Sequence, residues 1–194
     1  SSSVPRLHYV FDVSDTGVRR NSRDPEVWQL GPDLVQPVSE MIAREYGVYH
    51  ERLSQQISDL TGKLVDSYWD NNSGDILDIV DGSYLEQYHD YDKGVAFLNA
   101  ATVSTTYMLL SRCGLAENAH FGLEDFMPVF DFNTSQTVDA LGSAISGISE
   151  EILRNIEVTI KKYEREKLSE RSQENERTDL HSVSYTHLRA HETG

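Results

Sequence analysis

A stripe of apolar residues in the second half of the chain constrains the fold more than any other feature. Its members recur every three or four residues: Val138, Leu141, Ile145, Ile148, Ile152, Ile156 and Ile160. This spacing places them all on one face of an α-helix, and a face that long and apolar must be covered by other elements. The pattern therefore predicts a long helix, capped by Thr134 or Ser135, as the spine of a helical core. We expect the three isoleucines at its middle, Ile145, Ile148 and Ile152, to be buried.

Four shorter segments with helical spacing precede this stripe. The spacing predicts helices over residues 34–46, 53–68, 75–80 and about 95–112. Gly47 and Gly114 follow the first and the last of them, where glycine commonly ends a helix. The Asn-Asn-Ser-Gly sequence at residues 71–74 is expected to break the second helix, and Asp75 to begin the third. Together the segments predict a mainly α-helical, bundle-like domain over residues 34–165.

The N-terminal residues have a different pattern. Leu7, Tyr9, Phe11 and Val13 alternate with other residues, which predicts a short β-strand over residues 7–13, followed by a turn at residues 14–17. The chain enters this strand almost at once and has no initiator Met. We therefore expect residues 1–17 to be the end of a preceding, truncated domain.

Residues 18–33 form a polar loop in this interpretation. The loop contains Arg19, Arg20 and Arg23, the only local basic cluster outside the C-terminal region. Closely spaced arginines can bind phosphate groups, so these three are the candidate nucleic-acid contacts. A solvated loop is the simpler interpretation, and it is the one that we favour.

The connection before the long helix is rich in phenylalanine. Residues 115–133 contain Phe121, Phe126, Phe130 and Phe132. Aromatic side chains gain most from burial, so we expect these four to pack as a lid on the core.

The C-terminal region is charged and almost free of apolar residues after Lys161. Its composition predicts a charged linker or a frayed helix over residues 166–181. Residues 182–194, Ser-Val-Ser-Tyr-Thr-His-Leu-Arg-Ala-His-Glu-Thr-Gly, resemble a translated sequencing-adapter tail found on many gene fragments, so we expect a non-native tail there. His187 and His191 stand four residues apart but belong to this tail, and we discount them as metal ligands.

Composition excludes several classes of function. The chain has 17 Lys and Arg against 32 Asp and Glu, a net charge of −15, so direct nucleic-acid binding through a general basic surface is not expected. No run of residues approaches the roughly 18–20 apolar residues of a membrane helix. The single Cys113 cannot form an internal disulfide and is expected to be a packed thiol rather than a nucleophile. These features predict a cytoplasmic protein without membrane contact.

Acidic residues are concentrated in one third of the chain: Asp66, Asp70, Asp75, Asp78, Asp81, Glu86, Asp90 and Asp92. Asp70, Asn72 and Gly74 occupy positions one, three and five of a possible calcium loop. Asp75 then stands where that loop requires glycine, and the ligand at position five is missing. We interpret the acidic residues as a solvated face with helix-capping aspartates.

The chain lacks the common catalytic motifs. The histidines outside the tail are His8, His50, His89, His120 and His181, and no His-Glu-x-x-His sequence is present. No Gly-x-Ser-x-Gly elbow and no phosphate-binding loop is found either. The sequence therefore indicates no catalytic, cofactor-binding or metal-ligating residue.

Two stretches resemble a known family. Residues 9–16, Tyr-Val-Phe-Asp-Val-Ser-Asp-Thr, resemble the strand that ends the single-stranded-DNA-binding N-terminal domain of ArdC-type antirestriction proteins. Residues 107–115, Tyr-Met-Leu-Leu-Ser-Arg-Cys-Gly-Leu, with the long helix after them, resemble the closing half of the zincin-like metallopeptidase domain in that family. The resemblance covers roughly residues 7–165, and the overall likeness is to large multidomain proteins of conjugative elements.

The zinc ligands of that family have no counterpart here. Active members carry His-Glu-x-x-His upstream of the matched helix, and that window offers only His89 in this chain. Their third-ligand glutamate lies four residues before the matched tyrosine, and this position is Val103. The resemblance therefore implies a degenerate zincin-like domain that has lost its metal, with the DNA-binding domain proper upstream of Ser1.

From these observations we expect a non-catalytic helical domain of a bacterial conjugative or mobile-element protein. It would need no cofactor and would scaffold neighbouring DNA-processing domains of a larger polypeptide in the cytoplasm. One alternative is a hydrolase with an acidic site around Asp75–Asp92, which requires two carboxyl groups with strongly raised pKa values at one pocket. Another is an acidic DNA mimic that inhibits restriction enzymes, which requires regularly spaced carboxylates over a broad face.

Overall fold

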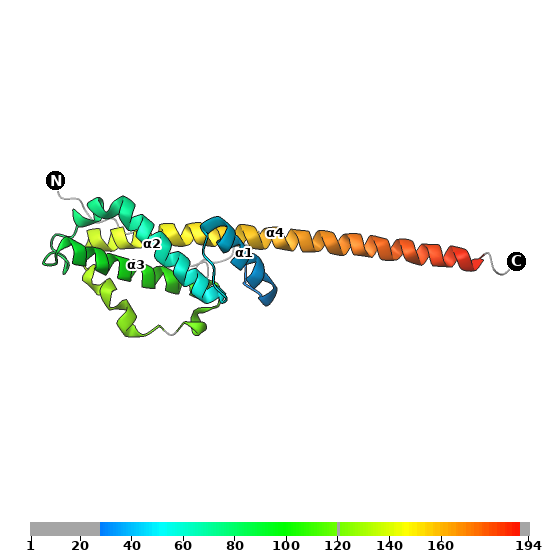
Figure 1. The fold of residues 1–194 in the computed structure, drawn as a ribbon, viewed down its shortest axis with the longest axis horizontal. Helices are drawn as coiled ribbons and strands as arrows, with labels where there is room; N and C mark the ends of the chain where they lie inside the picture. Colours follow the sequence, from blue (N-terminus) through cyan, green and yellow to red (C-terminus); the bar gives the residue numbers. More distant parts are fainter. Residues whose placement is uncertain (1–27, 120, 191–194) are drawn as a thin grey trace, which may run out of the picture.

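The structure is a computed structural model that describes residues 28–119 and 121–190. It confirms the predicted fold class, because the described chain is mainly helical. Three helices, α1 (Val35–Tyr46), α2 (Leu53–Leu77) and α3 (Asp90–Arg112), pack around the first part of a long fourth helix, α4 (Ser135–Ala190) (Figure 1). The β-strand expected over residues 7–13 and the cluster of Arg19, Arg20 and Arg23 lie outside the described residues.

Helix α1 (Val35–Tyr46) follows the short 3₁₀-helix η2 (Pro32–Leu34) and buries one apolar stripe. Val38, Met41 and Ile42 are fully or almost fully buried, as their spacing predicts. The helix ends at Gly47, whose φ of 67° lies in the left-handed region that favours glycine. The predicted boundaries of this helix are therefore confirmed.

Helix α2 (Leu53–Leu77) is longer than the sequence pattern predicts. The expected break at residues 71–74 is wrong, and so is the separate third helix over residues 75–80. The side-chain amides of Asn71 and Asn72 donate to the carbonyl oxygens of Ser67 and Tyr68, one turn earlier, instead of opening the helix. Non-ideal residues in a helix interior cost less than about 1 kcal/mol each, and the buried Ile76 beyond them offsets that cost.

Helix α3 (Asp90–Arg112) begins five residues earlier than predicted. Asp90 and Asp92 lie in its first turn, where negative charge favours the helix dipole. The helix passes close to α2, because the indole ring of Trp69 lies directly over Gly94 and leaves no room for a β-carbon there. Trp69 also packs against Phe97, with 5.3 Å between ring centroids.

Two 3₁₀-helices, η3 (Ala116–Asn118) and η4 (Leu123–Asp131), carry the chain back to the start of α4. Phe121 and Phe126 pack edge-on against the ring of Tyr107 on α3, and Phe132 is buried against Phe97. The expectation of a four-phenylalanine lid is wrong for one member, because Phe130 remains 60% exposed.

Helix α4 (Ser135–Ala190) is the spine of the structure. Helices α1, α2 and α3 all contact it. Its start is fixed by Thr134, whose hydroxyl oxygen accepts a hydrogen bond from the backbone N–H of Thr137 at 3.2 Å. Most of the predicted stripe is buried: Leu141, Ile148, Ile152, Ile156 and Ile160.

Two members of the stripe do not follow the prediction. Ile145, expected to be buried, is only half-buried at the edge of the core, and Val138 is 53% exposed. Of the two forms predicted for residues 166–181, a charged linker or a frayed helix, the structure has a helix, and α4 continues through these charged residues to Ala190. We call residues 135–167 the packed part of α4 and residues 168–190 its projecting part, which extends beyond the other helices (Figure 1). Among the described helices, none combines the length and the apolar character that a membrane span requires.

Candidate functional site

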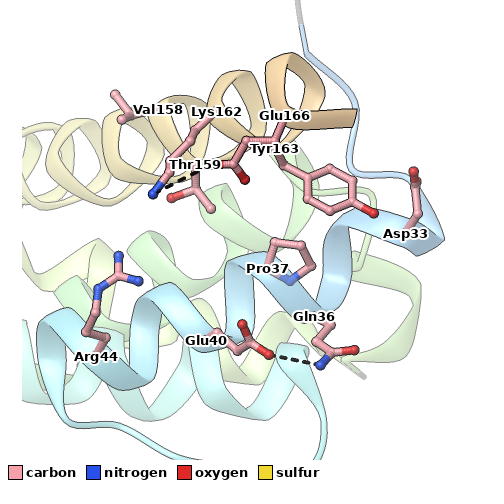
Figure 2. A pocket seen from close by; sticks show the side chains of 10 residues that line it. All are labelled: Asp33, Gln36, Pro37, Glu40, Arg44, Val158, Thr159, Lys162, Tyr163 and Glu166. Atoms are coloured by element: carbon pink, nitrogen blue, oxygen red, sulfur yellow. Dashed lines mark hydrogen bonds and ion pairs between the residues drawn. The ribbon is translucent and has the colours of Figure 1, made fainter. Parts of the chain in front are cut away.

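The candidate site is a groove where α1 crosses the packed part of α4. Its volume is about 420 Å³. Its lining comes from η2 and one face of α1 (Asp33, Gln36, Pro37, Glu40 and Arg44) and from one face of α4 (Val158, Thr159, Lys162, Tyr163 and Glu166), as Figure 2 shows. Residues four apart on a helix share a face, which explains how Gln36, Glu40 and Arg44 reach the same groove.

Charges in this groove are paired locally. Glu40 accepts a hydrogen bond from the Gln36 amide at 2.9 Å, and Glu166 lies 3.9 Å from Lys162 on the next turn of α4 (Figure 2). Arg44 donates to Glu45, its neighbour in sequence. The groove therefore presents both signs of charge beside the apolar surfaces of Pro37 and Val158, a lining suited to holding a polypeptide segment.

An ion pair involves Asp33, at the η2 end of the groove. Lys167 Nζ donates to Asp33 Oδ2 at 2.7 Å and lies 5.6 Å from the ring centroid of Tyr163. This hydrogen bond lowers the pKa of Asp33 and raises the pKa of Lys167. The pair joins η2 to the last turn of the packed part of α4.

A second polar contact joins α1 to α4. Asn155 donates to the Tyr46 hydroxyl oxygen at 2.6 Å, and the hydroxyl donates to Glu151 at 3.2 Å. Burial raises the pKa of the Tyr46 phenol above its usual value, so the phenol keeps its proton near neutral pH. These groups position two helices, and their geometry provides no activated nucleophile.

The structure separates the two positions that correspond to zinc ligands in the ArdC-type family. His89 is the exposed residue that precedes α3, whereas Val103 lies in the middle of that helix, half-buried. Fourteen positions along a helix correspond to about 21 Å. In the described part of the chain, no group of three or more His, Cys, Asp or Glu residues is arranged to hold a metal ion.

The eight acidic residues of the middle region are all exposed: Asp66, Asp70, Asp75, Asp78, Asp81, Glu86, Asp90 and Asp92. They are spread over the second half of α2, the turns after it and the first turn of α3. Two of them bond locally, since Glu86 accepts from the backbone N–H of Gly82 and Asp90 pairs with Lys93. This arrangement agrees with the solvated acidic face that the sequence predicts.

Cys113 is buried at the end of α3, with 4% of its surface exposed. Burial raises the pKa of its thiol to about 11. The thiol therefore stays protonated near neutral pH, and the expectation of a packed, unreactive cysteine is confirmed.

Sequence reasoning missed the groove between α1 and α4. Arg44 and Lys162 are 118 positions apart, so their meeting depends on how two helices cross. One signal was present: Tyr163 continues the apolar stripe by three residues beyond Ile160, which indicates that α4 remains in contact with its neighbours at that point.

Comparisons with known proteins gave no match: no family model, no curated protein and no solved structure is similar to this chain.

Proposed function

We propose that the chain is a non-catalytic helical domain that scaffolds neighbouring domains of a larger polypeptide. One observation carries this proposal: α4 is a single 56-residue helix that leaves the bundle without a break. Its packed part anchors it to three other helices, and its projecting part extends away from them (Figure 1). A helix held in this way can set the distance between a domain before the bundle and a domain after the helix.

The physical basis is the low cost of extending a helix that already exists. Nucleation is the unfavourable step of helix formation, and the packed part of α4 already provides the nucleus. Each further residue adds a backbone hydrogen bond at little net cost. Without the expected non-native tail, the 14 residues from Leu168 to His181 would reach about 21 Å beyond the bundle.

The parent protein is proposed to belong to a bacterial conjugative or mobile element and to be related to ArdC-type antirestriction factors. Support comes from the two sequence stretches alone. The second of them, residues 107–115, forms the end of α3 and the turn at Gly114, whose φ is 69°. The DNA that flanks the parent gene tests this origin. A neighbouring relaxase or helicase gene would support it, and a housekeeping operon would contradict it.

Distance measurements test the scaffolding role. Nitroxide labels on Ser146→Cys and Ser172→Cys span the boundary between the two parts of α4, and labels on Gln136→Cys and Lys162→Cys span the packed part alone. All four positions are exposed. Each pair is 26 residues apart, or about 39 Å along a continuous helix. The buried Cys113 will not compete for the label.

Double electron–electron resonance should give the same mean distance and a similarly narrow distribution for both pairs. If the Ser146–Ser172 pair gives a much shorter or much broader distribution than the control pair, the projecting part is not a rigid spacer. That result would contradict the proposed scaffolding role.

Metal content tests the non-catalytic part of the proposal. Protein purified without added metal should contain far less than one zinc ion per chain, and a chelator should leave its thermal unfolding unchanged. A metal bound only by the native state would raise stability by linkage, so its removal would lower the melting temperature. Stoichiometric zinc that is lost in the His89→Ala variant would contradict the degenerate-zincin interpretation.

A further inference from the structure

The charge of the chain is concentrated in the bundle. Residues 28–160 contain 21 Asp and Glu but only 6 Lys and Arg, which is a net charge of −15 and equals that of the whole chain. Within residues 64–92 there are eight acidic residues and no Lys or Arg. These residues lie where α2 passes into α3, at the end of the bundle remote from the projecting part of α4 (Figure 1). One end of the bundle is therefore strongly acidic.

Three tyrosines are exposed at this acidic end. The exposed fractions are 61% for Tyr84, 42% for Tyr88 and 81% for Tyr91. All three lie in or next to the connection between α2 and α3, and no other bundle segment of eight residues has three exposed aromatic side chains among those described. Tyrosine is enriched in protein interfaces because it offers a large contact area with few rotatable bonds.

A groove of about 380 Å³ is lined by Tyr88, by residues of the first turns of α3 and by residues of η4. Its apolar floor consists of Val95, Ala96 and Pro128, with Pro128 contributed by η4. Two carboxylates line it, Asp92 from α3 and Asp131 from η4. The first cation after Lys63 is Lys93, whose side chain is only 15% exposed and is paired with Asp90 at 3.1 Å. The positive charge of Lys93 is thus already paired with Asp90.

We propose that this groove, which Tyr88 lines, binds an arginine-bearing segment of a partner protein together with the exposed Tyr84 and Tyr91 near it in the chain; we call this surface the tyrosine groove. The planar guanidinium group can stack on a tyrosine ring and donate paired hydrogen bonds to a carboxylate, while its methylene groups lie on the apolar floor. Lysine offers the charge without the planar fork, so it fits less well. Nucleic acid is disfavoured, because its phosphates would meet uncompensated carboxylates.

This inference goes beyond the proposed scaffolding function and uses a different part of the molecule. The label distances along α4 can succeed or fail without any change at the tyrosine groove. Failure of peptide binding would therefore leave the scaffolding role intact, and a flexible α4 would leave the tyrosine groove intact.

Fluorescence anisotropy with a labelled twelve-residue peptide of alternating arginine and glycine tests the proposal on the full chain. A lysine–glycine peptide of the same charge should bind at least threefold more weakly. The Tyr88→Ala/Tyr91→Ala variant should weaken binding of the arginine peptide at least fivefold. The matched control is Tyr49→Ala, since Tyr49 is 76% exposed but lies on the connection between α1 and α2, and it should change the Kd less than twofold.

Charge variants distinguish binding at the tyrosine groove from general electrostatic attraction to the acidic chain. Asp92→Asn/Asp131→Asn should weaken binding at least fivefold, whereas Glu51→Gln/Asp59→Asn removes the same two charges elsewhere and should weaken it less than twofold. Equal weakening by both pairs would overturn the proposal, because it would show attraction to net charge alone. The absence of binding at 1 mM peptide would also overturn it, as would tighter binding of a single-stranded DNA oligonucleotide than of the arginine peptide.

Discussion

In the packed part of α4, side chains are buried every third or fourth residue from Thr137 to Ile160. In the projecting part, whose side chains the structure describes from Leu168 to Asn175, none is buried. Ile152 and Ile156 are fully enclosed by the other helices, and Leu168 is 63% exposed. The backbone is nevertheless one helix across both parts. Identical secondary structure therefore has two different physical origins in this molecule.

The packed part is helical because helicity lets it bury apolar surface, worth about 25 cal/mol for each Å² removed from water. The projecting part is helical because it extends a helix already formed and because its residues have favourable propensities. Burial depends on the rest of the protein, and propagation depends only on the preceding turn. The two parts should therefore respond differently to the same kind of substitution.

Truncation of an apolar side chain should give the largest difference. Ile152→Ala removes a fully buried side chain and should lower the free energy of unfolding by about 2–5 kcal/mol. Leu168→Ala, in the projecting part, should change it by less than about 0.5 kcal/mol. Urea denaturation measures both. Similar losses for the two variants would show that Leu168 is buried against a surface of the protein.

Proline substitutions should affect the two parts differently: in the packed part they should destabilise the whole bundle, and in the projecting part they should reduce only the helical content. Ser146→Pro, at an exposed position of the packed part, should lower the free energy of unfolding by about 3 kcal/mol, because it removes a backbone hydrogen bond and clashes with the preceding turn. Ser169→Pro should change the stability of the bundle by less than about 1 kcal/mol but should lower the helical circular dichroism signal. An unchanged signal would mean that the projecting part does not depend on the packed part for its helical conformation.

The Asp33–Lys167 ion pair lies at the boundary between the two parts. Because the pKa of Asp33 is lowered in the folded protein, the pair stabilises the boundary above the ordinary pKa of 3.8, and this contribution is lost as the pH falls through the lowered value. Lys167→Met should raise the pKa of Asp33 toward 3.8 in an NMR titration of its carboxyl carbon. Lys162→Met, one turn earlier, is the matched control and should leave the pKa of Asp33 where it is. An unmoved pKa in Lys167→Met would show that the boundary is held by other contacts.

Removal of residues 182–194 should have the smallest effect. This deletion shortens the projecting part only, so the melting temperature should fall by less than about 2 °C in a calorimetric scan. A larger fall would mean that these residues contribute to the core.

The sequence pattern predicted the features that depend on a single element and missed those that depend on two. The apolar stripe located α4, and its spacing placed Ile148 and Ile152 in the core. The predicted break at residues 71–74 was wrong because local propensity is overridden where α2 packs on α3, as at Trp69 and Phe97. The loss of apolar residues after Lys161 marks the end of burial, and α4 continues beyond it as a helix.

Sites between elements were beyond prediction from the sequence for the same reason. The amide of Gln56 donates to the carbonyl oxygens of Ser39 and Val48, and so fixes the connection between α1 and α2 from within the core. Helical spacing from Leu53 and Leu60 places Gln56 on the buried face, unlike the exposed Gln55, but it does not reveal which carbonyl oxygens the amide bonds. The groove of Figure 2 likewise exists only because α1 and α4 cross.

The contact between Tyr46 and Asn155 has a consequence for the order of assembly. Because 109 residues separate the two, the first helix cannot reach its partner until most of the chain has been synthesised. At about 5–20 residues per second, the delay is roughly 5–20 s. Throughout that interval Val38, Met41 and Ile42 have no α4 to cover them, so the nascent chain exposes an apolar surface that a chaperone can bind.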